Sequence, residues 1–304
     1  NRLSELWNLF RFINPGLLGS QERFNSEYAT PIEKYQDKAA AQRLKKLIQP
    51  FVLRRLKSHV LSELPPRTEI VLEVNLSAEE KAMYEVLRQN ALRQLESLQG
   101  PTEVHRLKVL AEIMKLRRFC CNSRLVVPDS TLGSAKLELF GDIVSELLSN
   151  HHKALVFSQF VDHLTIIRGY LDQHSVSYQY LDGSTSAKER KERVAAFQSG
   201  EGDLFLISLK AGGTGLNLTA ADYVIHMDPW WNPAVEDQAS DRAHRIGQQR
   251  PVTIYRLVTK QTIEEKIVAL HQTKRDLADS LLDGSDVSAR VTVDDLLALM
   301  RQID

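Results

Sequence analysis

A glycine-rich loop follows a short apolar run in the second half of the chain. Phe205 to Ile207 predict a buried strand, and the loop comes directly after it. Glycines let the backbone approach an anion closely, and successive backbone N–H groups bind phosphate. This pattern predicts an anion-binding loop made of Lys210, Gly212, Gly213, Thr214 and Gly215. A dinucleotide-binding fingerprint is the rival interpretation, which is weak because no third glycine follows and no acidic residue closes a ribose site.

Two adjacent tryptophans mark a second loop. The apolar run from Tyr223 to Met227 ends at Asp228-Pro229, where proline stops a strand, and Trp230 and Trp231 come next. Two neighbouring tryptophans are costly to leave in water. This loop is therefore a second candidate functional segment.

A predicted helix after this loop carries two arginines. Pro233 stands at a favourable first helical position, and Gln238, Arg242 and Arg245 follow at spacings of four and three. Because residues three and four apart are neighbours on a helix, we expect all three side chains to project from one face. Three acidic residues lie among them: Glu236, Asp237 and Asp241. A solvated, ion-paired helix face is therefore the alternative to a functional role.

Together these segments resemble motifs V and VI of the Swi/Snf-type family of helicase superfamily two, the DNA-translocating ATPases. The resemblance is carried by SLKAGGTGLNL, DPWWNPAVEDQASDRAHRIGQ and PVTIYRLV. It implies that Arg242 and Arg245 are catalytic and reach the γ-phosphate of ATP, with Gln238 on the same face. It also implies that Gly215 and Asn217 belong to the nucleotide-binding residues.

Two further segments resemble motif IV of the family and the motif beside it, KALVFSQF and YLDGSTSAKER. Each places polar residues just after a predicted strand, and ligands of an open parallel sheet gather outside the carboxyl ends of its strands. The resemblance implies that one strand of double-stranded DNA contacts Ser158, Gln159, Gly183, Ser184, Thr185, Lys210, Gly213, Thr214 and Trp230. Taken alone, Ser158 could cap a helix and Gly183 to Thr185 could form a turn.

The chain contains no G-x-x-x-x-G-K-[ST] loop and no acidic Walker B box. Its first residues, NRLSELWNLFRFINPGLLGS, resemble the text that follows the first ATPase lobe in the family. We therefore expect this chain to begin just past that lobe, and the N-terminal ATPase lobe of the same protein to be its partner and to hold most of the contacts to ATP and Mg²⁺. Arg54, Arg55 and Lys57 resemble the LRR-x-K box between the lobes, and they either contact DNA or the other lobe, or are solvated.

From Ser134 onward, the alternation of helices and strands predicts a parallel sheet. The expected strands are 68–76, 154–157, 178–181, 205–207, 224–227 and 252–257. Capping boxes predict helix starts at Ser77, Ser186 and Thr262, with Glu265 completing the last box. We therefore expect the α/β fold class, and the resemblance implies a RecA-like helicase C-terminal lobe with inserted and flanking helices. We expect a helical protrusion and linker over residues 1–132, the lobe over 133–260, and a brace helix and tail over 261–304.

Composition restricts the alternatives. Lysine plus arginine equals aspartate plus glutamate, 39 against 39, so any nucleic-acid surface must be a local patch. Cys120 and Cys121 lack zinc-ligand spacing, and two cysteines are too few for a disulfide framework, which points to a reducing, cytoplasmic compartment. The histidines are not expected to form a metal-binding site. They include His151, His152, His226 and His244. No membrane span is visible in the sequence.

The resemblance implies that this chain is the second motor lobe of an ATP-dependent double-stranded-DNA translocase, a DNA-dependent ATPase when joined to its first lobe. Its grip on phosphate and sugar would carry no base information, so sequence preference should be slight. Two alternatives stay open: a lobe of a strand-separating helicase, and a non-enzymatic module that binds nucleic acid or a partner. Further protein partners are not predicted.

Overall fold

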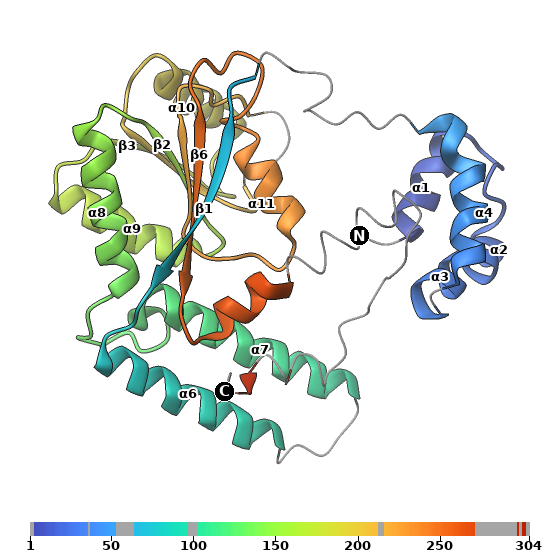
Figure 1. The fold of residues 1–304 in the computed structure, drawn as a ribbon, viewed down its shortest axis with the longest axis horizontal. Coiled ribbons are helices and arrows are strands. Elements are labelled where there is room, and N and C mark those ends of the chain that lie inside the picture. The colour runs from blue at the N-terminus through green and yellow to red at the C-terminus, as the bar shows by residue number, and fades with distance from the viewer. Residues whose placement is uncertain are drawn as a thin grey trace. The chain divides into compact units, whose positions relative to one another are not determined.

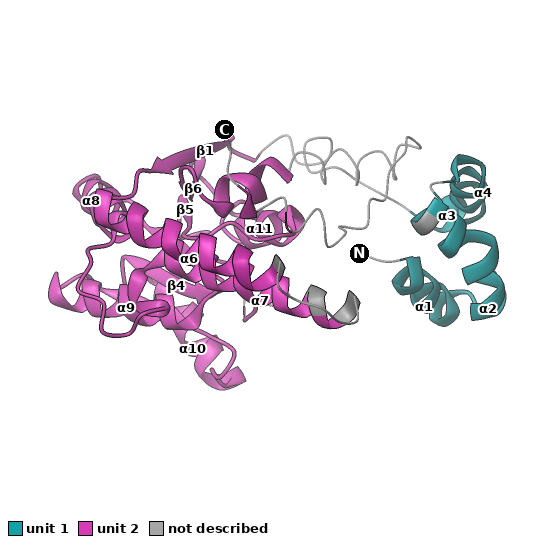
Figure 2. Ribbon diagram, turned by 90° about the horizontal axis from the view of Figure 1, so that it is seen from below, with its two compact units in different colours: residues 1–62, 272–292 teal, residues 63–271, 293–304 magenta. Residues whose placement is uncertain are grey.

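The computed structural model describes residues 3–35, 37–52, 64–96, 102–211, 216–270, 297, 300 and 301. The chain divides into two compact units (Figure 2). Unit 1 comprises residues 1–62 and 272–292, and unit 2 comprises residues 63–271 and 293–304. None of the described helices is long and apolar enough to cross a membrane.

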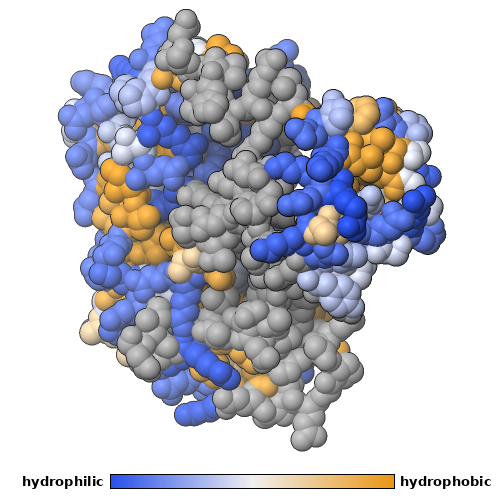
Figure 3. Space-filling model, turned by 45° about the vertical axis from the view of Figure 1, so that its right-hand side comes forward, coloured by the Kyte–Doolittle hydropathy of each residue, from blue (hydrophilic) through white to orange (hydrophobic). Residues whose placement is uncertain are grey.

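Unit 1 is helical over its described residues. It contains α1 (Leu3–Ile13), α2 (Gln21–Phe24), η1 (Asn25–Ala29), α3 (Thr30–Tyr35), α4 (Lys38–Ile48) and η2 (Gln49–Phe51). Trp7, Phe10 and Phe24 form the centre of its small core. α1 also leaves Leu9, Phe12 and Ile13 exposed, and Figure 3 shows apolar atoms gathered on the body at the right of the view.

Unit 2 is built on a parallel sheet in the order β1-β6-β5-β2-β4-β3 (Figure 1). The strands are β1 (Arg67–Val74), β2 (Ala154–Ser158), β3 (Tyr178–Leu181), β4 (Leu204–Ser208), β5 (Tyr223–His226) and β6 (Val252–Thr259). Every residue of β2 and β4 is buried, which explains their continuous apolar sequences. The expected strands are confirmed to within two residues at each end.

Helices cover both faces of the sheet. α8 (Ala135–Ser149) and α9 (Val161–Gln173) pack on one face, and α10 (Ala187–Gln198) and α11 (Pro233–Ser240) pack on the other (Figure 1). The predicted capping box at Ser186 and Glu189 opens α10 with both of its hydrogen bonds. This arrangement confirms the expected RecA-like fold class.

The helical protrusion consists of α6 (Ala78–Glu96) and α7 (Thr102–Cys121), followed by η3 (Ser123–Leu125). Ser77 and Glu80 form the predicted capping box of α6. A helix over residues 263–270 begins differently from expectation. Thr262 Oγ1 accepts from the N–H of Glu264, and Glu265 accepts from the N–H of Gln261, so the predicted reciprocal pair between Thr262 and Glu265 does not form. The remainder of the expected brace helix lies outside the described residues.

The compact unit that holds the sheet begins at residue 63, well before the expected boundary at 132 and 133. The reason is that β1 joins the sheet by pairing with β6 along its whole length, from Arg67 opposite Val252 to Val74 opposite Thr259. The protrusion then follows β1 and packs against the same body, since Tyr84 Oη accepts from the N–H of Ile263 at 2.8 Å. The residues between 64 and 132 therefore lie in the same compact unit as the sheet. The expected domain boundaries stay a prediction.

Candidate functional site

The candidate residues fall into two groups. The first follows the carboxyl ends of β2, β3, β4 and β5, which lie together because the strands are parallel. The second is the segment 241–247, here called the arginine segment, which follows α11. Hydrogen bonds tie the arginine segment to Pro65 and Arg67, at the amino end of β1. The side chain of Arg242 nevertheless lies near Arg190, which bonds to Ala211 just after β4.

The glycine loop connects these two groups. Gly213, Thr214 and Gly215 lie outside the described residues, whereas Lys210 and Asn217 on either side are exposed. The residues that flank the loop are anchored. Ala211 accepts a hydrogen bond at its carbonyl oxygen from Arg190 Nη1 at 2.8 Å, and the N–H of Leu218 donates to the carbonyl oxygen of Arg242 at 3.0 Å.

The prediction that Gln238, Arg242 and Arg245 share one helical face is wrong. α11 ends at Ser240, so Gln238 lies on the helix and the two arginines lie in the turns beyond it. Gln248 explains the end of the helix, because its Nε2 donates to the carbonyl oxygens of Ala221 at 2.8 Å and Ala243 at 3.0 Å. This buried side chain holds the arginine segment in a non-helical path, and spacing alone does not reveal it.

Arg242 and Arg245 differ in environment. Arg242 is only 7% exposed, whereas Arg245 and Gln238 are exposed. Burial, together with the positive charge of Arg190, lowers the pKa of Arg242 to about 10. An anion in contact with Arg242 would offset both effects, because a negative charge favours the protonated guanidinium.

Ser158 occupies the end of β2, but its side chain is 1% exposed. Its hydroxyl donates to Asp228 Oδ1 at 2.5 Å and accepts from the N–H of Phe160 at 3.1 Å, at the start of α9. The expected contact of this hydroxyl with DNA is therefore corrected: Ser158 is buried and bonded within the chain. It does not cap α9, because the N-cap of that helix is Phe160. Gln159 is half-buried beside it, and its N–H donates to the same carboxylate at 3.2 Å.

Asp228 receives these bonds because a buried arginine faces it. Arg117 of α7 lies 3.6 Å from Asp228, and both side chains are 0% exposed. Arg117 Nη2 also donates to the carbonyl oxygen of Pro229 at 2.6 Å. Burial raises the pKa of Asp228, and Arg117 opposes that rise. No local sequence pattern indicates this ion pair, because it joins residues 111 positions apart.

The tryptophan loop packs around the same guanidinium. Arg117 lies 5.4 Å from the ring of Phe160 and 5.7 Å from each of the rings of Trp230 and Trp231. Both tryptophans are half-buried, and the backbone N–H of Trp230 donates to Glu236 Oε1 at 2.6 Å. The cost of exposing two tryptophans is thus largely removed by contacts within the chain. Trp230 keeps partial exposure beside the carboxyl ends of the strands.

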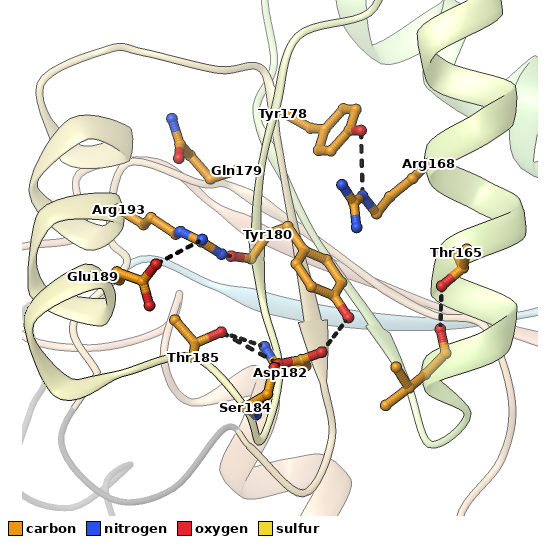
Figure 4. A pocket seen from close by; sticks show the side chains of 11 residues that line it. Thr165, Arg168, Tyr178, Gln179, Tyr180, Asp182, Ser184, Thr185, Glu189 and Arg193 are labelled. Atoms are coloured by element: carbon orange, nitrogen blue, oxygen red, sulfur yellow. Dashed lines mark hydrogen bonds and ion pairs between the residues drawn. The ribbon is translucent and has the colours of Figure 1, made fainter.

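The loop after β3 forms a turn around Asp182 (Figure 4). Ser184 donates its N–H at 2.9 Å and its hydroxyl at 2.6 Å to Asp182 Oδ1, and the N–H of Asp182 donates to Thr185 Oγ1 at 3.1 Å. Hydrogen bonds from Ser184 and Tyr180 lower the pKa of Asp182 to about 2. The turn interpretation is confirmed. Gly183 is exposed in open space, so its backbone is accessible to a ligand.

An open pocket lies beside this turn, between α9 and α10 (Figure 4). Two arginines border it. Arg168 lies 4.6 Å from the ring of Tyr180, and Arg193 donates to the carbonyl oxygen of Tyr180. The acidic residues Asp182 and Glu189 also line the pocket, so its charge is balanced rather than strongly basic.

A buried polar cluster lies beneath the tryptophan loop. Possible ligand atoms of Cys121, His163 and Asp228 lie within 4.8 Å of one another. Two cations oppose a metal ion there: Arg117, paired with Asp228, and Lys136, which is buried with Glu264 at 2.6 Å. Burial and Lys136 lower the pKa of His163 to about 3, so this imidazole is neutral. The charge of the cluster thus favours ion pairing over cation binding, and the expectation of no metal set stays a prediction.

Comparison with protein-family models gives two matches. Residues 135–247 match the helicase conserved C-terminal domain, and residues 1–125 match the SNF2-related domain. A Bacillus subtilis protein called an ATP-dependent helicase/translocase, YwqA, is 37% identical over 97% of this chain and 33% of the relative. The chromatin structure-remodeling complex subunit snf21 of Schizosaccharomyces pombe is 34% identical over 100% of this chain and 27% of the relative. The chain thus spans about a third of the length of these curated relatives.

Two solved structures from Sulfolobus solfataricus are similar in fold. The SWI2/SNF2 ATPase core in complex with dsDNA has a TM-score of 0.62 and 36% identity, covering 93% of this chain and 61% of that chain. The C-terminal domain of a SWI2/SNF2 ATPase has a TM-score of 0.60 and 30% identity, covering 75% of this chain and 92% of that chain.

Proposed function

Because the chain belongs to the SWI2/SNF2 family of ATPases, we propose that it forms the second motor lobe of an ATP-dependent double-stranded-DNA translocase. In this proposal the carboxyl ends of β2 to β5 contact one DNA strand, and the arginine segment contacts ATP. A first ATPase lobe is the partner that binds most of the nucleotide and Mg²⁺. The exposed apolar side chains of α1, Leu9, Phe12 and Ile13, support a contact of unit 1 with a further domain.

The environment of Arg242 is the observation that carries this proposal. The side chain is buried close to a second arginine, Arg190, and both conditions disfavour its positive charge. Binding an anion such as the γ-phosphate would offset them. Arginine in that position would stabilise charge that develops on the transferred phosphoryl group. Arg245, three residues further along, is exposed. In this proposal it contacts the same phosphate.

The backbone of the arginine segment supports coupling between the two groups of residues. Arg242 accepts from Leu218 at the end of the glycine loop, and Arg190 donates to Ala211 at its beginning. A shift of Arg242 on nucleotide binding would therefore move the loop that carries Lys210, Gly213 and Thr214. This connection gives a physical route from ATP to the DNA contacts.

DNA contact in this proposal is made mainly by exposed groups. Lys210 and Gly183 fulfil that condition, and Trp230 and Gln159, which are half-buried, fulfil it in part. Ser158 contributes by holding the Asp228 loop. Nucleotide contacts are proposed for Gly215 of the glycine loop and for Asn217, which follows the loop and is exposed. Arg54, Arg55 and Lys57 lie outside the described residues, and their proposed contact is with DNA or the first lobe.

A test of the function compares two DNA assays on a protein that contains both ATPase lobes. A translocase should displace the third strand of a DNA triplex in an ATP-dependent manner without separating the strands of a plain duplex. Separation of the duplex would instead identify a strand-separating helicase. ATP-independent binding with no activity in either assay would identify a non-enzymatic binding module.

A further inference from the structure

The first residues of unit 2 hold the arginine segment by two polar contacts and α11 by a third. The two terminal nitrogens of Arg67, at the start of β1, lie 3.1 Å from Asp237 of α11 and 3.3 Å from Asp241. Three residues after Asp241, His244 Nε2 donates to the carbonyl oxygen of Pro65 at 2.9 Å. Asp241 and His244 stand on either side of Arg242. The chain that enters the lobe is therefore bonded to the residues that flank the proposed catalytic arginine.

A second layer of charges supports the first. Glu69 pairs with both Arg67 and Arg256, and Arg256 Nε donates to Glu236 of α11 at 2.8 Å. Burial raises the pKa of Glu69, but the hydrogen bond and charge of Arg256, with the charge of Arg67, lower it to about 2. Glu69 therefore remains ionised near neutral pH and keeps both arginines in place.

The alternation of β1 explains why these contacts reach α11. Successive side chains of a strand point to opposite faces. Leu72 and Val74 pack in the core beneath α8 and α9, whereas Arg67 and Glu69 contact α11 and Arg256 on the other face. One strand thus contributes to the core with one face and positions α11 with the other.

We propose that Arg67 is a positioning residue for Arg242, so that the start of β1 determines where the proposed catalytic arginine lies. The inference rests on the proposed role of Arg242 in ATP hydrolysis. β1 is the first strand of unit 2 and follows unit 1 in sequence. A displacement of β1 would pull Asp237 and Asp241 with it, and would move Arg242, which follows Asp241 directly.

The partial exposure of the ion pairs of Arg67 favours a positioning role over a purely stabilising one. The side chain of Arg67 is 22% exposed, and those of Asp237 and Asp241 are 34% and 33% exposed. Ion pairs this accessible contribute little to folding. A misplacement of about 1 Å can nevertheless reduce turnover by about 100-fold, because catalysis depends on the orientation of the reacting groups.

The experiment uses a protein with both ATPase lobes and replaces Arg67 by methionine. DNA-stimulated kcat should fall by about 10- to 100-fold, while DNA affinity, the KM for ATP and the urea unfolding midpoint stay close to wild type. Arg67→Lys should lose less, because a point charge can still pair with one carboxylate at a time. Asp241→Asn tests the same contact from the arginine segment and should also lower kcat.

Glu73→Gln is the matched control. Glu73 lies on the same strand and pairs with Lys260 at 2.6 Å, at the end of β1 away from the arginine segment. This variant should keep wild-type kcat. A normal kcat for Arg67→Met, beside an inactive Arg242→Lys, would overturn this inference and leave the proposed function standing. A normal kcat for Arg242→Lys would overturn the proposed function itself. If DNA affinity or the unfolding midpoint of Arg67→Met fell in step with kcat, the role would be structural and the inference wrong.

Discussion

The buried pair of Arg117 and Asp228 gives a prediction of stability that changes with pH. Replacing Arg117 by methionine keeps the volume of the side chain but leaves Asp228 without its counter-ion, both groups being 0% exposed. Removing one partner of a buried pair costs about 3–5 kcal/mol. Because Ser158 and Gln159 still donate to Asp228, we expect the lower end, about 3 kcal/mol at neutral pH.

The direction of the pH dependence follows from Asp228. Burial already raises its pKa in the folded state, and the loss of Arg117 raises it further. Below the pKa that Asp228 has in the unfolded chain, about 4, the carboxyl group is neutral in both states and its burial costs little. As pH rises through the raised pKa of the folded state, the buried group must ionise and the folded protein loses stability. The destabilisation by Arg117→Met should therefore be small below about pH 4 and should grow toward neutral pH.

The assay is urea unfolding followed by tryptophan fluorescence. The chain has three tryptophans, so a Trp7→Phe background restricts the signal to Trp230 and Trp231 beside Arg117. The double variant Arg117→Met with Asp228→Asn should recover much of the loss, because no buried charge remains. Arg118→Met is the matched control, since its partner Asp162 is exposed, and it should cost about 1 kcal/mol or less. Equal losses for Arg117→Met and Arg118→Met, or a loss independent of pH, would refute the reasoning.

Three further predictions concern the motor. The chain alone should hydrolyse no ATP above background, because it lacks a Walker A lysine and a Walker B acid; DNA-stimulated turnover that its own mutations abolish would contradict this. Lys210→Ala should reduce the slope of log affinity for duplex DNA against log salt by about one, because one phosphate contact is lost, and an unchanged slope would remove Lys210 from the DNA surface. Ser158→Ala should lower stability by about 1–3 kcal/mol, because Asp228 loses a buried donor, while leaving the affinity of the folded protein for duplex DNA unchanged; a weaker affinity would place its hydroxyl on DNA.

Local sequence patterns predicted most of the lobe. The strands and the starts of the helices α6 and α10 were correctly anticipated because apolar runs, capping residues and turn residues act over a few positions. The pairing of β1 with β6 was not, since it joins residues far apart in sequence. A largely exposed strand gives no local sign of the sheet that it joins.

The site shows the same limit. The helical spacing of Gln238, Arg242 and Arg245 is real in sequence, but Gln248 and Leu218 bind the backbone that would have continued the helix. Ser158 was expected to face DNA from its place after a strand and from the family resemblance. Its partner Asp228 lies 70 residues away, so no local pattern indicated their hydrogen bond. Long-range hydrogen bonds therefore decide which polar residues after the strands are structural and which are accessible.

The central claim is that the arginine segment acts on ATP, and the most direct test measures kcat for DNA-stimulated hydrolysis beside DNA affinity in a protein with both lobes. Arg242→Lys should reduce kcat by on the order of a thousandfold, because lysine lacks the planar fork that contacts two phosphate oxygens. Arg245→Lys should behave similarly, and both should bind DNA and fold as wild type does. A kcat near the wild-type value for Arg242→Lys would contradict the account.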